Sequence, residues 1–436
     1  MAGLTVDGGE RGRAWRWLAG PVQRGIEALV GVDLNVVAIT AATVVLCGTG
    51  LLSIYMGESG DAGGGRALHQ GTYVIAAIGI MLLVSAVDYR RWGPVAYPAF
   101  GVTLVLLALL VAAKTLDRPL PMIHPINGAW RWIDLGAFQL QPSEFAKIAY
   151  ILALAWYLRY RTNYRTLAGL IRPLGLTLLP MFLILKEPDL GTVLLLLPVF
   201  FAMLLVAGAK RRHLAGLLMM CVLAAPALYY AMHDYQRMRV LGAVLQAEAA
   251  RAWLLAHPKA LSVLQVTPAQ VAQWQRDEGY QLDRSKATLA TGGVTGVRDA
   301  DADCMQYGFL PEWHTDFIFA VVGHRWGLVG CGLVLACYGV ILAGGCRIAA
   351  ATNEPFGRLL AVGAVVLLTT QAMINVGMAI GLWPVAGITL PFVSYGGSSL
   401  TASGAIMGLL LSVGLRKPIV LAPEPFLFED LSEGGR

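Results

Sequence analysis

The sequence predicts an all-α integral membrane protein with about ten transmembrane helices. Composition is the first observation: of 436 residues, 57% are hydrophobic and only 14% are charged, and the mean hydropathy is +0.63. Soluble domains carry about 25% charged residues, so an aqueous fold could not bury this much apolar surface. The second observation is a series of apolar runs of membrane-spanning length. The third is the placement of Lys and Arg between those runs.

The apolar runs give the expected helices in order. A spanning helix needs about 20 mainly apolar residues. Ten runs meet this requirement, at residues 34–55, 70–88, 95–114, 143–160, 166–185, 190–208, 213–232, 315–346, 357–382 and 395–415. The two longest, 315–346 and 357–382, are expected to tilt or to extend beyond the bilayer.

The basic residues predict the orientation of the chain. Clusters follow the second, fourth, sixth and tenth runs and flank the gap after the eighth: Arg90, Arg91, Arg159, Arg161, Arg165, Lys210, Arg211, Arg212, Arg347, Arg358, Arg416 and Lys417. With the N-terminus inside, all of them fall on the cytoplasmic side, as the positive-inside rule requires. We therefore expect cytoplasmic tails at 1–33 and 418–436 around a transmembrane domain at 34–417. Because the cations lie in these short clusters, the net charge of +6 does not indicate a nucleic-acid partner.

This orientation leaves five connections outside the cell. The longest, 233–314, has no apolar span, and loops of that length are usually functional or disordered. Helical patterns at 247–264 and 268–275 favour a functional loop. The six cysteines show no paired Cys/His spacing of a zinc site.

Most polar residues near the membrane fall on the outer face, and the first group precedes the fourth run. Ser143 is expected to cap that helix. Glu144 and Lys147 are three residues apart and share a helix face, which suits an ion pair as well as a ligand site. Arg131 stands between two tryptophans and is expected to be either an interfacial anchor or a phosphate ligand.

Two further groups bring carboxylates to the same face. Asp189 enters the sixth run and is expected first as a helix start, with its carboxylate on the positive helix end. Asp316 stands at the lip of the eighth run, near Glu312 and His314. An ionisable group at that depth is a functional candidate, although it could also simply cap the helix.

The fourth group is rich in glycine and serine, and contains Ser394, Gly396, Gly397 and Ser398. Such residues expose backbone N–H groups that can hold an anion, and they equally allow close helix packing. Together the four groups place carboxylates, cations and anion-holding backbone on one membrane face. That combination suits a lipid-linked, phosphate-bearing substrate.

These segments, in this order, resemble the signature motifs of the SEDS family, which comprises the RodA, FtsW and SpoVE type proteins of shape, division and sporulation. The matching segments are 127–144, 188–192, 314–319 and 390–399. The resemblance implies a ten-helix, multi-pass protein of the bacterial cytoplasmic (inner) membrane. It further implies a peptidoglycan glycosyltransferase that polymerises lipid II, an undecaprenyl-diphosphate-linked substrate, and a class B penicillin-binding protein as partner.

The family's essential aspartate corresponds to Asp316, which would act as general base on the attacking sugar hydroxyl. Cationic side chains or a divalent ion, Mg or Mn, would offset the charge of the departing diphosphate. The reaction is expected to invert the anomeric centre. The residues expected to contact substrate are Arg131, Glu144, Lys147, Asp189, Arg237, Lys286, Glu312, His314, Ser394, Gly396, Gly397 and Ser398.

The chain also departs from the family pattern. Gly323-His324-Arg325 replaces a Gly-Glu-Glu run, and in a continuous helix His324 would lie about 12 Å below Asp316. Glu187 replaces the usual glutamine, and the stretch 239–280 is longer than usual. Two other interpretations therefore stay open: a lipid II flippase, and a catalytically weak scaffold for a class B penicillin-binding protein. The sequence does not decide between roles in elongation, division and sporulation.

Overall fold

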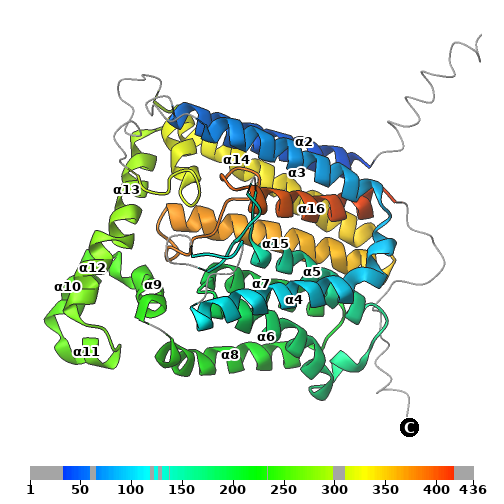
Figure 1. Cartoon of the computed structure of the whole chain (residues 1–436), viewed down its shortest axis with the longest axis horizontal. Helices are drawn as coiled ribbons and strands as arrows, with labels where there is room; N and C mark the ends of the chain where they lie inside the picture. Colours follow the sequence, from blue (N-terminus) through cyan, green and yellow to red (C-terminus); the bar gives the residue numbers. More distant parts are fainter. Residues whose placement is uncertain are drawn as a thin grey trace, which may run out of the picture.

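The computed structural model describes residues 33–58, 65–117, 122–125, 130–136, 138–232, 234–297 and 310–416. Long helices lie side by side in a bundle, and a group of shorter helices projects from one end of it (Figure 1). The predicted tails lie outside the described residues except for Asp33, and so does the start of the first polar motif at 126–129.

The bundle contains α2 (Leu34–Gly57), α3 (Arg66–Ala86), α4 (Trp92–Leu116), α5 (Pro142–Leu158), α6 (Ile171–Lys186), α7 (Leu190–Val206), α8 (Arg211–Ala231), α14 (Ile318–Ala351), α15 (Pro355–Ala379) and α16 (Gly397–Gly414). The projecting group contains α9 (Asp234–Leu245), α10 (Glu248–Ala256), α11 (Pro258–Val263), α12 (Pro268–Arg276) and α13 (Glu278–Thr291). Short 3-10 turns are η1 (Tyr89–Arg91), η2 (Asn163–Arg165) and η3 (Ala168–Leu170). A small antiparallel hairpin pairs β1 (Ile133–Asp134) with β2 (Gln139–Leu140).

Each of the ten predicted runs overlaps one bundle helix, with differences of a few residues at the ends. Within the described residues, eight helices are long and apolar enough to cross a membrane by length and composition. The other two bundle helices, α5 and α7, are shorter, at 17 residues each. The prediction of an all-α polytopic membrane protein is therefore confirmed, while the number of spans and their sidedness stay predictions.

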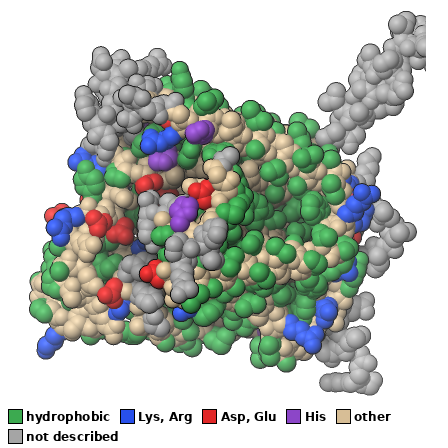
Figure 2. Space-filling view, in the orientation of Figure 1, with side chains coloured by type: hydrophobic (Ala, Val, Ile, Leu, Met, Phe, Trp, Pro, Cys, Tyr) green, Lys and Arg blue, Asp and Glu red, His purple; other side chains and the backbone are tan. Residues whose placement is uncertain are grey.

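The surface of the bundle is apolar, as a lipid-facing surface should be. The peripheral helix α8 exposes Leu218, Met219 and Leu223 by more than half, whereas most of α15 is buried. Figure 2 shows Lys and Arg side chains at both ends of the molecule, whereas Asp, Glu and His side chains lie mainly towards the end that carries α9–α13.

Helices α3 and α16 show how small residues let the bundle close tightly. A Cβ added to Gly404 would lie 2.4 Å from the carbonyl oxygen of Ala77, and one added to Gly408 would lie 2.7 Å from that of Met81. Membrane helices associate through such close backbone approach because lipid gives them no hydrophobic drive to pair.

The described part of the long connection 233–314 is mostly helical. The helical patterns predicted at 247–264 and 268–275 correspond to α10, α11 and α12. The group has an apolar cluster of its own: Met238, Leu241, Leu245, Leu254, Leu261, Val266, Val271 and Trp274. Tyr229, at the end of α8, donates a hydrogen bond to the Leu264 carbonyl at 2.9 Å and ties this group to the bundle.

Helix α14 is broken near its start, so the predicted continuous helix over 315–346 is wrong. Gly327 has φ 63° and ψ −156°, a combination that essentially only glycine adopts. A Cβ added to Gly323 would lie 3.2 Å from the Sγ of Cys331, although eight residues of straight helix span about 12 Å. The segment before Gly327 therefore folds back against the segment after it.

This break changes the expected role of the His324-Arg325 pair. His324 is buried, with its Nδ1 2.7 Å from the Thr291 hydroxyl. Arg325 donates to the Met56 carbonyl at 3.0 Å, near the end of α2. The Val297 N–H also bonds the His324 carbonyl at 2.9 Å. The pair therefore ties the end of the outer connection to the bundle instead of lying on a straight helix beneath Asp316.

Replacing Gly327 with alanine should destabilise the fold by about 2 kcal/mol or more, because alanine is strained at this positive φ. Its Cβ would also lie 2.4 Å from the Val294 carbonyl group. Thermal unfolding of the purified protein in detergent would show this as a lower midpoint. Gly332→Ala is the matched control in the same helix, because nothing lies within 4 Å of its new Cβ. Equal midpoints for the two variants would contradict the turn at Gly327.

Candidate functional site

An open groove of about 950 Å³ lies among the segments that precede α5, α7, α14 and α16. Its volume is typical of small-molecule sites, which span about 300–1,000 Å³. Eight residues predicted from the sequence line it: Arg131, Glu144, Asp189, Glu312, Asp316, Gly396, Gly397 and Ser398. The structure thus brings all four polar groups of the sequence to one place.

Asp316 lies just before α14, and both its backbone N–H and its carbonyl are hydrogen-bonded. Its N–H donates to the Glu312 carbonyl at 3.1 Å, and its carbonyl accepts from the Asn375 side chain at 2.9 Å. A Cβ added to Gly387 would lie 3.7 Å from the Asp316 Oδ2, at ordinary contact distance, so Gly387 lies directly beside the carboxylate.

The environment of Asp316 suits a general base. Burial, and after it the nearby Glu312 carboxylate, raise the pKa of Asp316 to about 6. The charges of Arg239 and Arg131 and a hydrogen bond from Thr315 act in the opposite direction. A carboxylate with this pKa is ionised at neutral pH and still accepts a proton readily.

Asp189 starts α7, as predicted. Its Oδ1 accepts from the Thr192 N–H at 3.1 Å, and its Oδ2 accepts from the Thr192 hydroxyl at 2.9 Å. The Ser143 hydroxyl donates to the same Oδ2 at 3.1 Å. Helix α5 begins at Pro142, so the expectation that Ser143 caps its own helix is wrong. Ser143 instead links two helix starts through Asp189.

Glu144 and Lys147 form the ion pair that their spacing allowed. The Lys147 Nζ lies 2.9 Å from the Glu144 carboxylate and donates to the Gln371 amide oxygen at 3.2 Å. Lys147 is only 1% exposed and lies behind the groove wall, whereas Glu144 lines the groove. Lys147 therefore does not line the groove itself, and its positive charge is paired with Glu144, which does.

Arg131 is held by backbone carbonyls at the end of α6. Its Nε donates to the Glu187 carbonyl at 2.8 Å, and a second guanidinium N–H donates to the Pro188 carbonyl. The adjacent Trp130 is buried beside Ile123. Trp130 thus anchors the segment while the half-buried guanidinium borders the groove, and the role of Arg131 as a phosphate ligand stays a prediction.

The glycine- and serine-rich segment forms the start of α16. The Ser398 hydroxyl accepts from the Gln141 N–H at 3.0 Å and donates to the Gln139 carbonyl. Ser394 lies behind the groove and donates to the Thr315 carbonyl at 2.5 Å. His314 also lies behind it, 5.5 Å from the Tyr395 ring centre, and burial lowers the pKa of His314.

Two predicted cations lie elsewhere. Arg237 binds the Asp234 carboxylate at 2.6 Å and the Gln265 side chain, and Lys286 donates to Gln246 at 3.2 Å. Arg239, which the sequence analysis missed, lines the groove instead. Two arginines two positions apart on one helix face different directions, so the sequence could not show which one meets the groove.

No group of three or more His, Cys, Asp or Glu side chains among the described residues has the arrangement of a metal site. The divalent ion expected from the family resemblance stays a prediction.

Glu187 is an unusual buried acid behind the wall near Arg131. Its side chain is fully buried, and neither carboxylate oxygen has a hydrogen-bond partner among the described residues. Burial, and then the Asp189 charge, raise the pKa of Glu187 to about 9 against the opposing charges of Arg131 and Lys114. Glu187 is therefore neutral in the folded protein at neutral pH.

Comparison with known proteins places this geometry in context. Residues 34–417 match the sequence model of the FtsW, RodA and SpoVE family, described as cell cycle protein. The probable peptidoglycan glycosyltransferase FtsW of Geobacter metallireducens is 34% identical over 354 residues, which cover 80% of this chain and 84% of that protein. The peptidoglycan glycosyltransferase MrdB of Escherichia coli is 32% identical over 343 residues, covering 77% and 83%.

Solved structures agree with the sequence relatives. A chain from a study of a peptidoglycan synthase complex that coordinates polymerization and crosslinking superposes with a TM-score of 0.64 at 30% identity, covering 88% of this chain and 97% of that one. The crystal structure of the rod shape determining protein RodA of Thermus thermophilus gives a TM-score of 0.58 at 27% identity, covering 88% and 96%.

Replacing Glu187 with glutamine should stabilise the protein at neutral and alkaline pH. Folding holds this carboxyl protonated, whereas the unfolded chain ionises it above its ordinary pKa of 4.5. The wild type therefore loses stability as pH rises from 4.5 towards 9, and the variant escapes that loss. We expect a gain of at least about 1 kcal/mol at pH 8 and none at pH 4.5.

The measurement is thermal unfolding in detergent between pH 4.5 and 9. Glu248→Gln, at an exposed glutamate of α10, is the matched control and should show no such gain. A difference between Glu187→Gln and wild type that does not change with pH would contradict the buried neutral acid.

Proposed function

The chain belongs to the FtsW, RodA and SpoVE family, and from that premise we propose that it is a peptidoglycan glycosyltransferase that polymerises lipid II at the outer face of the bacterial cytoplasmic membrane. One observation carries the proposal within this chain. Asp316 borders an open groove, has a pKa raised to about 6 by burial, and shares the groove with two arginines. This is the arrangement that a base-assisted transfer from a diphosphate leaving group needs.

The proposed reaction joins two sugars. A hydroxyl of the acceptor sugar attacks the anomeric carbon of the donor sugar, and Asp316 takes the hydroxyl proton as the new C–O bond forms. The bond between that carbon and the diphosphate breaks, and the electron pair leaves with undecaprenyl diphosphate. A direct displacement of this kind inverts the anomeric centre, because no enzyme-linked sugar intervenes.

The two arginines have the chemistry that the leaving group requires. Guanidinium groups bind phosphate oxygens through paired N–H donors, and Arg131 and Arg239 both border the groove. The backbone N–H groups at the start of α16 lie in the same groove at Gly396 and Gly397, and they offer further anion contacts.

We also propose a class B penicillin-binding protein as partner. The support is the likeness to the chain from the peptidoglycan synthase complex. Glycan polymerisation and crosslinking are successive steps on one product, so a polymerase gains from a transpeptidase bound beside it.

Asp316→Ala should abolish polymer formation from labelled lipid II by the full-length protein with its partner. Removal of a general base costs about 10²- to 10⁴-fold in rate, so we expect loss beyond detection on a gel of glycan products. A wild-type complex that moves lipid II across liposomes without polymerising it would identify a flippase. Partner binding with neither activity would identify a scaffold.

The polymerisation rate should rise with pH through an apparent pKa near 6, because Asp316 acts in its ionised form. Glu312→Gln removes a negative charge that raises the pKa of Asp316, so the rising limb should shift to lower pH. Initial rates between pH 5 and 8 measure both effects. A limb that stays in place in the Glu312→Gln variant would show that another group controls it.

A further inference from the structure

We propose that Arg239 is a mobile ligand of the substrate diphosphate, exchanging its contact with Glu278 for phosphate oxygens when the lipid-linked donor enters the groove. The inference rests on the proposed function, since it adds a residue to the same site. It also gives a role to the long outer connection, whose first helix, α9, carries this arginine.

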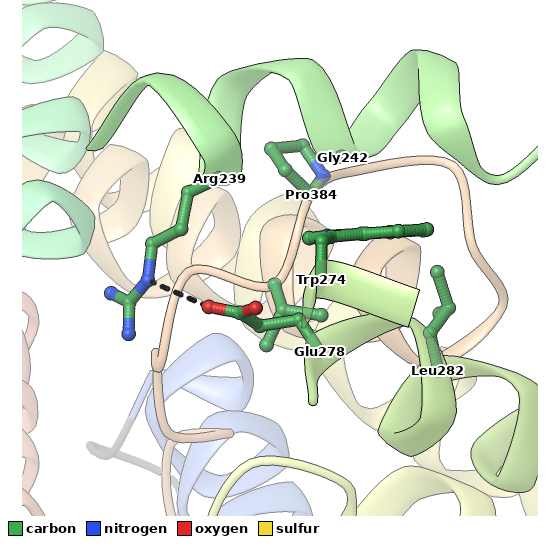
Figure 3. A pocket seen from close by; sticks show the side chains of 7 residues that line it. Arg239, Gly242, Trp274, Glu278, Leu282 and Pro384 are labelled. Carbon is green, nitrogen blue, oxygen red and sulfur yellow. Dashed lines mark ion pairs between the residues drawn. The ribbon is translucent and has the colours of Figure 1, made fainter. Parts of the chain in front are cut away.

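Arg239 borders the groove from the side of the projecting helices. It lines the groove together with Asp316, and it also packs beside Trp274, Glu278 and Pro384, where there is no room for a water molecule. Figure 3 shows its side chain extending from α9 towards Glu278, with the terminal guanidinium nitrogens directed away from Trp274. A short movement of this side chain can therefore carry its charge from Glu278 further into the groove.

Glu278 holds Arg239 weakly. The Arg239 Nε lies 4.0 Å from the Glu278 Oε1, which is beyond the 2.7–3.2 Å of a hydrogen bond. The two side chains are 26% and 28% exposed, and ion pairs in such positions contribute little. Within the described part of the chain, this contact is the one ion pair or hydrogen bond that the guanidinium makes.

Arg131, the other arginine of the groove, is constrained differently. Two of its N–H groups are already donated to the carbonyls of Glu187 and Pro188. Those bonds fix where Arg131 lies and leave it fewer donors for a ligand. Arg239 keeps its planar set of donors, which matches two phosphate oxygens at once.

The groove needs a second cation. Glu312 and Asp316 border it as carboxylates, and a diphosphate placed beside them would be repelled. Of the charges that lower the pKa of Asp316, that of Arg239 has the larger effect, ahead of Arg131. Arg239 is thus already close enough to act on the catalytic carboxylate.

The projecting helices hold the base of Arg239 in place. Met238 and Leu241, on either side of it in α9, are buried in the apolar cluster with Trp274. A Cβ added to Gly242 would lie 2.9 Å from the Trp274 Nε1, so α9 packs closely against this ring. The long segment therefore places one flexible cation over the groove on a firm support.

Kinetics of the full-length protein with its partner test this proposal. Arg239→Gln should raise the KM for lipid II by about ten- to a hundredfold, the usual effect of losing a charge-assisted hydrogen bond. It should also move the rising limb of the pH profile to higher pH, because the charge that lowers the pKa of Asp316 is gone. Arg239→Lys should restore the limb but only part of the KM, because lysine keeps the charge without the planar donors.

Two further variants complete the series. Glu278→Gln should lower KM, since it removes the competing contact. Arg276→Gln removes the same charge from an exposed position of α12 and should stay within about twofold of wild type. Arg239→Gln behaving like Arg276→Gln in both KM and pH profile, while the wild type polymerises, would overturn the role of Arg239 and leave the proposed function standing.

A binding measurement separates the two proposals. The purified wild type should bind undecaprenyl diphosphate more tightly than undecaprenyl monophosphate, and Arg239→Gln should lose most of that preference. If the wild type makes no polymer, the proposed function fails, but this measurement still tests Arg239. If Arg239→Gln kept the preference of the wild type for the diphosphate, the proposed contact between Arg239 and the diphosphate would be wrong, whether or not the protein polymerises lipid II.

Discussion

The groove depends on one buried amide. Asn375, fully buried in α15, donates from its Nδ2 to the carbonyl of Asp316 at 2.9 Å and to that of Ile388 at 2.6 Å. One side chain thus joins the segment before α14 to the segment before α16. Without it, two carbonyls would lose their partners in a low-dielectric interior, where unsatisfied polar groups are costly.

The same requirement explains the other buried polar residues around the groove. Irregular backbone survives at membrane depth only where protein or water satisfies its polar groups. Gln371 donates to the Thr389 carbonyl at 3.0 Å, and Gln70 donates to the Ser394 carbonyl at 3.1 Å. The bundle helices therefore supply amide side chains to the loops they enclose. This is how a site made of loops is held firmly at the end of a helix bundle.

The sequence predicts the bundle well because hydropathy and spanning length are local properties. Each of the ten apolar runs overlaps a helix, and the polar motifs meet because the helices that follow them begin at the same end of the bundle. The break at Gly327 was not predictable in this way, because the hydropathy of an apolar run that contains a glycine is the same whether the helix continues or turns there. The burial of individual side chains could not be predicted from the sequence either. Lys147 and Glu144 stand one helical turn apart, yet only Glu144 borders the groove.

The charged side chains of the groove are of two kinds: those that hold its wall together and those that are available for the reaction. Four carboxylates line it, but Glu144 is paired with Lys147, and Asp189 accepts hydrogen bonds from Thr192 and Ser143. Glu312 and Asp316 have no ion pair within 4 Å among the described residues, and burial together with the Glu312 charge raises the pKa of Asp316 to about 6. Asp316 therefore stays available to take a proton, because Glu144 and Asp189 are already paired or hydrogen-bonded within the groove wall.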